Sequence, residues 1–151
     1  MTAKTSPSSV DARALKEAWA GLAFDVRTFE VRAEDTLDFA QACGETDPRF
    51  VDGSHADFQA PTTFASCLAG GRLLPEGFPR FGKAAFDAGK CVTPHSPIRA
   101  GDRLVGTSTV HDVYEKTGRS GTMIFLVHRM EFTNQRGELT SVVEGRMVGR
   151  L

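Results

Sequence analysis

The sequence predicts an α+β fold in which an antiparallel sheet curls around a central buried helix. The stretch Pro61–Gly71 is small and apolar on all sides, and a helix without a polar face belongs in a core. From Cys91 onward the pattern changes to strand-like alternation with turn signals between the strands. The chain has 151 residues, a length typical of one domain. A sheet wrapped around one buried helix accommodates both stretches.

A mobile tail and a first helix are expected at the start of the chain. Residues 1–9 are polar and are expected to form the tail, so that the domain spans residues 10–151. The helix should begin at a cap provided by Ser8 or Ser9. Its inward face is expected to carry four residues at helical spacing, Leu15, Ala18, Trp19 and Leu22.

A short strand and a second helix are expected next. Val26–Val31 alternates as a strand does, and Glu34–Cys43 has an acidic first turn that suits the helix dipole. Gly44 is expected to end this helix in the left-handed conformation. Glu45–Ala60 has little periodicity and is expected to be a loop, and loops of that length in compact domains are often functional.

The remainder is expected to form the buried helix and a meander of strands. Pro61 opens the helix at a favoured first position, and the segment Arg72–Lys90, rich in proline and glycine, is expected to be irregular with a helical turn near Lys83–Asp87. Turn signals at Thr117–Gly121 and Asn134–Gly137 predict hairpins. The expected strands are Cys91–Val92, Arg103–Tyr114, Thr122–Asn134 and Leu139–Val148. One face of the third strand carries Ile124, Leu126, His128, Met130 and Phe132.

This order of elements is compatible with two folds. In the first, the meander curls around the helix that begins at Pro61, which is the hotdog arrangement. In the second, the helices precede a curved sheet in a cystatin-like cone. The alternation along the strands does not distinguish the two.

Composition and motifs exclude several classes of protein. The net charge is −1, from 18 basic and 19 acidic side chains, whereas proteins that bind nucleic-acid phosphates normally carry a basic excess. The longest uncharged run, Phe58–Gly71, is too short to span a bilayer, and no secretory signal is expected. Cys43, Cys67 and Cys91 favour reduced thiols in a cytoplasmic protein. Without a nucleotide-binding, phosphate-binding or zinc-type motif, no cofactor and no metal are expected.

The strongest candidate for chemistry follows the glycine at the end of the second helix. Two carboxylates, Glu45 and Asp47, stand there beside Pro48. A buried carboxylate at such a place could have a raised pKa and act as a general acid or base. In the alternative interpretation, Asp47 and Pro48 only begin a turn and Glu45 is solvated.

The segment Ala42–Asp52, followed by Ala60–Phe64, resembles the MaoC-like dehydratase family, and more specifically its N-terminal, FAS1-like dehydratase branch. The resemblance runs from about Phe29 to the C-terminus. It also rests on the order and spacing of Val31–Ala40, Pro97–Asp102, Glu115–Gly121 and Phe132–Leu139. It implies a hotdog fold and a substrate carried as a thioester on coenzyme A or acyl carrier protein. The implied reaction, in fatty acid metabolism, is the reversible addition of water across a 2-enoyl double bond.

This chain departs from the family's catalytic pattern. In active members an aspartate and a histidine of one loop activate the water and move the proton. Here Glu45 stands at the aspartate position, Asp47 at the intervening asparagine position and Phe50 at the histidine position, while Pro48 is kept. Glu45 can still act as a base, but phenylalanine transfers no proton, and His55 comes too late in the loop. The family contains paired hotdogs in which one half lacks the catalytic pair and shapes the acyl pocket, and these substitutions fit such a half.

The resemblance also implies a substrate-binding wall around the buried helix. A backbone N–H at the start of that helix would polarise the thioester carbonyl. The glycines at its end could let the thioester approach the backbone, or their role could be simply to end the helix. In the same way, the role of the threonines could be simply to cap the helix. The residues expected to bind substrate are Phe50, Pro61, Thr62, Thr63, Phe64, Leu68, Gly70, Gly71 and His95.

The expected function is therefore that of an acyl-thioester hydratase or dehydratase. The chain should be a homodimer or pair with another, catalytic hotdog chain, because a lone hotdog leaves a sheet edge open. If it acts alone, Glu45 is the expected base. Two other functions stay open. One is a hotdog thioesterase that uses a carboxylate and a bound water, and the other is a non-catalytic module that binds an acyl group or another apolar ligand.

Overall fold

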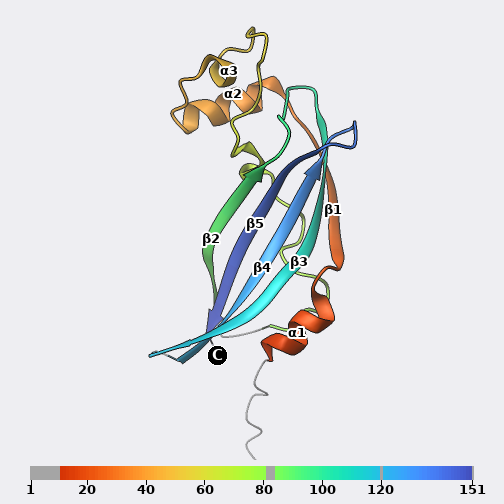
Figure 1. Ribbon diagram of the computed structural model, residues 1–151, viewed down its shortest axis with the longest axis vertical. Helices are drawn as coiled ribbons and strands as arrows, with labels where there is room; N and C mark the ends of the chain where they lie inside the picture. Colours follow the sequence, from red (N-terminus) through yellow and green to blue (C-terminus); the bar gives the residue numbers. More distant parts are fainter. Residues whose placement is uncertain (1–10, 81–83, 120, 151) are drawn as a thin grey trace, which may run out of the picture.

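A five-stranded antiparallel sheet, strongly curled along its length, organises the computed structural model, which describes residues 11–80, 84–119 and 121–150 (Figure 1). The strand order is β1-β3-β4-β5-β2. The strands are β1 (Ala23–Glu30), β2 (Ala85–Pro94), β3 (Arg103–Gly118), β4 (Gly121–Thr133) and β5 (Leu139–Arg150). The expected tail, residues 1–9 with the caps Ser8 and Ser9, lies outside the described residues. The predicted α+β hotdog arrangement with its curled sheet is confirmed.

Strands β3, β4 and β5 form the predicted meander. Thr117 pairs with Thr122 at the first hairpin, and the turn after Thr133 leads directly into β5. On the inner face of β4, Ile124, Leu126, Met130 and Phe132 are buried, which confirms the predicted alternation. Two inward-facing residues of β3, Leu104 and Val110, are also fully buried. One side of the meander is therefore an apolar inner face.

The cap of helix α1 (Ala12–Trp19) is Asp11 rather than the predicted Ser8 or Ser9. Its carboxylate accepts hydrogen bonds from the N–H groups of Arg13 and Ala14. Leu15 is buried as predicted, and Trp19 is partly buried against the same cluster. Ala18 and Leu22 were expected to face inward, but both are exposed. The helix ends at Trp19, so Leu22 lies beyond it and no longer shares its inward face.

Helices α2 (Ala33–Ala42) and α3 (Pro48–Val51) lie beyond one end of the sheet (Figure 1). Gly44 follows α2 with a φ of +70°, which confirms the predicted left-handed end. The N–H of Glu45 then donates to the carbonyl of Ala40, which fixes the direction in which the chain leaves the helix. The expected loop after Gly44 thus contains one short helix.

The predicted buried helix over Pro61–Gly71 is wrong in extent. The structure has a single 3₁₀ turn, η1 (Phe64–Cys67), after which Leu68 is extended. Threonine, serine and cysteine are weak helix formers, and two glycines follow them. In addition, the N–H of Gly71 donates to Asp25 Oδ2 at 2.7 Å, which ties the chain after η1 to strand β1. Neither Thr63 nor another side chain caps η1.

Strand β2 replaces the irregular segment and helical turn that were predicted near Lys83–Asp87. It runs over Ala85–Pro94 and pairs with β5, so the predicted strand Cys91–Val92 is only its final part. A break in register between Asp87 and Lys90 accommodates Gly89, whose φ is +111°. This bulge explains why the sequence shows no alternation there.

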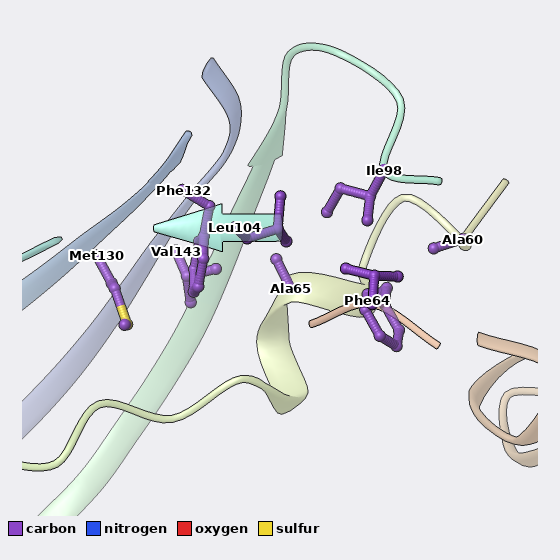
Figure 2. Packing of buried hydrophobic residues seen from close by; sticks show 9 residues of the cluster. Ala60, Phe64, Ala65, Ile98, Leu104, Met130, Phe132 and Val143 are labelled. Carbon is purple, nitrogen blue, oxygen red and sulfur yellow. The ribbon is translucent and has the colours of Figure 1, made fainter. Parts of the chain in front are cut away.

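Two apolar clusters cover the inner face. The first joins η1 to the sheet and is shown in Figure 2, where Ala65 points from η1 toward Leu104. Its buried members are Val31, Ala60, Phe64, Ala65, Ile98, Leu104, Met130, Phe132 and Val143. The second cluster packs α1 on the sheet and contains Ala12, Leu15, Phe78, Val110, Val113, Ile124 and Leu126. Met130 and Val143 of the first cluster also line the larger of two cavities.

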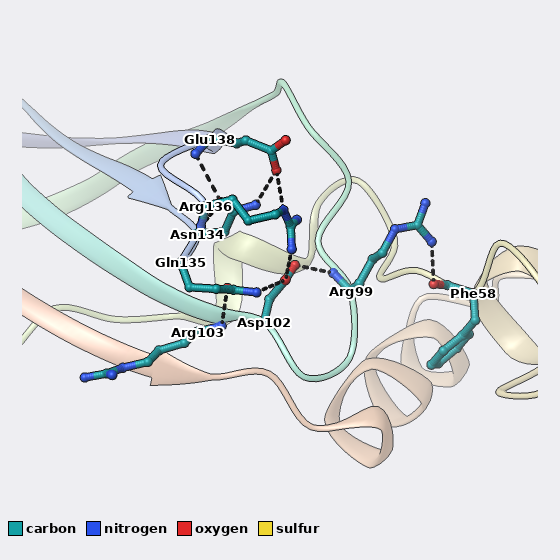
Figure 3. Close-up of polar contacts among 8 residues, drawn as sticks. All are labelled: Phe58, Arg99, Asp102, Arg103, Asn134, Gln135, Arg136 and Glu138. Carbon is teal, nitrogen blue, oxygen red and sulfur yellow. Dashed lines mark hydrogen bonds and ion pairs between the residues drawn. The ribbon is translucent and has the colours of Figure 1, made fainter.

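The segment before β3 is fixed by a buried carboxylate, Asp102, which is 3% exposed. It accepts hydrogen bonds from the Arg99 N–H at 2.9 Å, Gln135 Nε2 at 3.0 Å and Arg136 Nη1 at 3.2 Å (Figure 3). Because these donors come from two loops, Asp102 ties the β4–β5 turn to the chain that enters β3. Buried charges are tolerated when they are paired and hydrogen-bonded in this way.

We expect Asp102→Ala to lower the free energy of unfolding by about 2 kcal/mol, because it leaves several donors without their acceptor and removes an ion pair with a half-exposed arginine. Urea denaturation measures the change. Asp38→Ala, which removes an exposed carboxylate from α2, is the matched control and should change it by less than about 0.5 kcal/mol. Equal losses in both variants would contradict the anchoring role of Asp102.

Candidate functional site

Two cavities lie along strands β2 and β5. The smaller one, of about 130 Å³, lies where β2 ends and the chain approaches η1. It brings together three of the predicted substrate-binding residues, Pro61, Thr62 and His95. Its other lining residues are Gln59, Ala60, Pro94, Ser96, Pro97, Ile98 and Ser141. Threonine, glutamine, serine and histidine side chains therefore supply hydrogen-bonding groups in an otherwise apolar pocket.

The larger cavity, of about 400 Å³, is a groove between the chain after η1 and the inner face of the sheet. Two predicted substrate-binding residues, Leu68 and Gly70, form part of its wall. The sheet side contributes β4 and β5, and β2 contributes the region of its bulge. The other lining residues are Ala69, Leu73, Ala85, Phe86, Asp87, Lys90, His128, Met130, Val143, Gly145, Arg146 and Met147. We refer to this cavity as the groove.

The chain that carries η1 connects the two cavities. Pro61 and Thr62 line the small pocket, whereas Leu68 and Gly70, just after η1, line the groove. Strand β5 follows the same direction, since Ser141 lines the pocket and Gly145 the groove. An extended ligand that enters both cavities would therefore run alongside η1.

Gly70 and Gly71 are held close to the sheet. A Cβ at Gly70 would lie 3.0 Å from Asp25 Oδ2 and 3.1 Å from Ser108 Oγ, and one at Gly71 would collide with the Arg27 guanidinium. The Gly71 N–H donates to Asp25 Oδ2, so this glycine is bound by the sheet. A side chain at Gly70 would crowd Asp25 and Ser108, whereas one at Gly71 would have to displace the flexible end of Arg27.

The predicted catalytic carboxylates lie between α2 and α3 and line neither cavity. Asp47 caps α3: its carboxylate accepts from the Arg49 N–H and forms an ion pair with Arg49 Nη2 at 2.7 Å. The hydrogen bonds from the Arg49 side chain hold the pKa of Asp47 below its ordinary value, so the carboxylate stays ionised. Glu45 is half-buried, and its side chain forms no hydrogen bond or ion pair with the residues that the structure describes.

The remaining predicted residues have distinct surroundings. Phe50 is half-buried, and the Arg49 guanidinium lies 5.4 Å from its ring centre. Phe64 is buried in the first apolar cluster (Figure 2). Its ring is edge-on to Phe39, and it lines neither cavity. Thr63 is exposed at the start of η1.

His128 is a residue of the groove that was not among the predicted site residues. The sequence did contain a signal, because His128 alternates into the inner row of β4 between Leu126 and Met130. Its ring packs against Phe24, with ring centres 5.8 Å apart. Burial is the main reason that the pKa of His128 lies below its ordinary value, so the ring is neutral at physiological pH.

The partial burial of His128 predicts a pH dependence of stability. The unfolded chain protonates this histidine at a higher pH than the folded chain does. The part of the free energy of unfolding that depends on the neutral ring is therefore fully present above about pH 6.5 and is lost as the pH falls toward the folded pKa. The stability of wild type relative to His128→Asn should therefore decrease between about pH 7.5 and pH 5.5. Urea denaturation of both proteins across this range measures it, and carboxylates common to both cancel in the difference. A constant difference would contradict the prediction.

Two classes of feature are missing from the described part of the chain. No three histidine, cysteine, aspartate or glutamate side chains gather there where they could hold a metal ion. None of its helices is long and apolar enough to cross a membrane.

Comparison with known families agrees with this architecture. The family described as "FAS1-like, dehydratase domain region" matches residues 18–143. The chain belongs to this FAS1-like dehydratase family. A relative, a UPF0336 protein of Parafrankia sp. (strain EAN1pec), is 35% identical over 127 residues, which cover 78% of this chain and 80% of the relative. The resemblance inferred from Ala42–Phe64 and the later segments is confirmed.

Solved structures of MaoC-like dehydratases share the fold of this chain. The truncated HadBC (3R-hydroxyacyl-ACP dehydratase) complex from Mycobacterium tuberculosis contains a chain that superposes with a TM-score of 0.64 and 24% identity, covering 86% of this chain and 96% of that one. A MaoC-like dehydratase from Phytophthora capsici superposes with a TM-score of 0.65 and 19% identity, covering 93% of this chain but 49% of that one. The hotdog domain thus corresponds to about half of that longer chain.

Proposed function

We propose that this FAS1-like dehydratase is a pocket-forming subunit of an acyl-thioester hydratase or dehydratase. Its substrate would be a 2-enoyl or 3-hydroxyacyl group on coenzyme A or acyl carrier protein, and no other cofactor would be needed. The observation that carries the proposal is an apolar groove of about 400 Å³ in a family member whose histidine position is Phe50. The chain has room for an acyl group but no side chain at that position to transfer the proton.

The two cavities suit different parts of such a substrate. Thr62, His95 and neighbouring polar side chains could hold the thioester end in the small pocket. The acyl chain would then pass η1 and enter the groove, where Leu68, Met130 and Val143 offer apolar contacts. Each methylene that leaves water in the groove stabilises the complex by about 0.8 kcal/mol.

Pairing with a second hotdog chain would complete the site. Strand β2 is at the edge of the sheet, and nine of its ten residues are exposed. Phe86 on this strand is 62% exposed and Leu73 is 65% exposed, and both stand at the groove. An open strand edge beside exposed apolar side chains favours association with another sheet. The complex named in the HadBC structure and the longer Phytophthora chain support such pairing.

We also place the protein in the reducing cytoplasm, as a proposal, because its three cysteines are free and exposed.

The partner would supply the aspartate and histidine that activate water. Glu45 remains the candidate base on this chain should it act alone. Asp47 accepts hydrogen bonds from the Arg49 side chain, so it is better suited to shape the loop than to exchange protons.

The experiment that tests this function isolates the affinity-tagged chain from its native host together with any bound partner. We expect a second hotdog chain to co-purify and the complex to hydrate 2-enoyl-CoA, seen as loss of enoyl absorbance. Release of free thiol from saturated acyl-CoA would instead identify a thioesterase. Binding of acyl-CoA without turnover by any assembly would identify a non-catalytic acyl-binding module.

A further inference from the structure

The inner face of the sheet contains one polar side chain that borders the groove without a partner. His128 lines the groove, and neither of its ring nitrogens forms a hydrogen bond within the described part of the chain. Nε2 is sealed from solvent without a partner, which leaves Nδ1 as the ring nitrogen that a molecule in the groove could reach. His128 is half-buried, so a ligand that covers Nδ1 displaces solvent from this nitrogen and must supply a hydrogen bond in exchange.

The surrounding charges do not supply a partner. Asp25 and Lys90 are the charged groups whose fields act on His128. Asp25 Oδ2 accepts the Gly71 N–H, and Lys90 Nζ donates to the Ser66 carbonyl at 3.1 Å. Both groups are therefore engaged in holding the chain around η1 against the sheet.

The walls around His128 are apolar and open. Met130 and Val143 lie beside it on the inner face, and Gly145 pairs directly with it across β4 and β5. A Cβ at Gly145 would meet no atom within 4 Å, so the groove has free space at the level of the imidazole. An apolar chain that fills this space would bring its own atoms against the histidine ring.

We infer that the groove takes an acyl group that carries a hydroxyl or keto oxygen away from the thioester, and that His128 recognises this oxygen. A neutral imidazole nitrogen donates or accepts one hydrogen bond, so it matches either oxygen. An unsubstituted chain would cover the imidazole without satisfying it, which costs free energy in an apolar site. The inference rests on the proposed function, because it assumes that the groove holds an acyl chain.

Ser108 provides a matched control. Its Oγ is also buried and unpartnered, on the same inner face, but it lies beneath Gly70 and does not line the groove. Substitution of Ser108 by alanine removes an equally unpartnered polar atom without changing the wall of the groove. His128→Asn is the conservative variant, since its amide keeps a hydrogen-bonding atom close to the position of Nδ1.

The test is calorimetric titration of the tagged protein, with any bound partner, using stearoyl-CoA and hydroxystearoyl-CoA isomers that differ in the position of the hydroxyl. We expect one isomer to bind about tenfold more tightly than stearoyl-CoA, as one neutral hydrogen bond allows. His128→Phe should lose this preference, His128→Asn should keep part of it and Ser108→Ala should keep all of it. Circular dichroism and urea denaturation show that each variant is folded.

The outcomes separate the inference from the function on which it rests. Equal affinity of wild type for all of the thioesters would overturn the role of His128 and leave the acyl-binding function standing. A preference that survives in His128→Phe would also overturn it. No binding of any thioester would instead reject the acyl-binding function itself.

Discussion

Purified on its own, this chain is expected to hydrate 2-enoyl-CoA at least about a hundredfold more slowly than its complex with a catalytic hotdog chain. General acid–base catalysis by a positioned side chain contributes about 10²- to 10⁴-fold, and Phe50 cannot supply it. Glu45 is half-buried with no hydrogen-bonding partner among the described residues, and Asp47 is held ionised by Arg49. The loop therefore keeps its shape but offers no matched pair of acid and base.

Glu45→Gln distinguishes a pocket-forming chain from a catalytic one. In the complex, we expect the turnover number to stay within about twofold of wild type, because the partner would move the proton. Asp38→Asn, an exposed carboxylate of α2, is the matched control for a change of charge near this loop. Loss of most turnover in Glu45→Gln alone, with an unchanged urea midpoint, would show that this chain supplies the base.

The strands of the meander could be predicted because their signal is local. The alternation from Ile124 to Phe132 and the turn at Asn134–Gly137 define β4 and its hairpin without knowledge of distant contacts. The length of the buried helix could not be predicted in that way. Its end depends on the hydrogen bond from the Gly71 N–H to Asp25, a residue 46 positions away. Only the final part of β2, Cys91–Val92, was predicted, because the bulge at Gly89 hides the alternation before it.

The candidate site was predicted only in part, for a related reason. Pro61, Thr62 and His95 were each expected to bind substrate, and the structure brings them together at the small pocket. The groove was not predicted, because it exists where the chain after η1 is extended rather than helical. Gly145 and His128 become wall residues only when β5 and β4 pair in this register. Phe64 was expected to contact substrate, and its apolar character is equally explained by its buried place in the core.

Filling the groove should remove long-chain binding. Gly145→Leu places a side chain in open space, at a residue that lines the groove and has an ordinary strand conformation. Because each excluded methylene forfeits about 0.8 kcal/mol, exclusion of three should weaken binding of stearoyl-CoA by more than tenfold. Binding of the short crotonyl-CoA should stay within about twofold of wild type. Calorimetric titration of the two thioesters measures both effects.

The fold should tolerate this change, which makes the result interpretable. Replacing a glycine inside a strand removes its entropic penalty of about 0.5–1 kcal/mol, so Gly145→Leu should unfold at no lower urea concentration than wild type. Gly118→Leu is the matched control: it lies near the β3–β4 hairpin, its Cβ also meets open space, and it lines neither cavity. Unchanged affinity of Gly145→Leu for stearoyl-CoA would show that the acyl chain lies elsewhere. If Gly145→Leu weakened the binding of crotonyl-CoA equally, the small pocket would not be the site of the thioester with the groove as the site of the acyl chain.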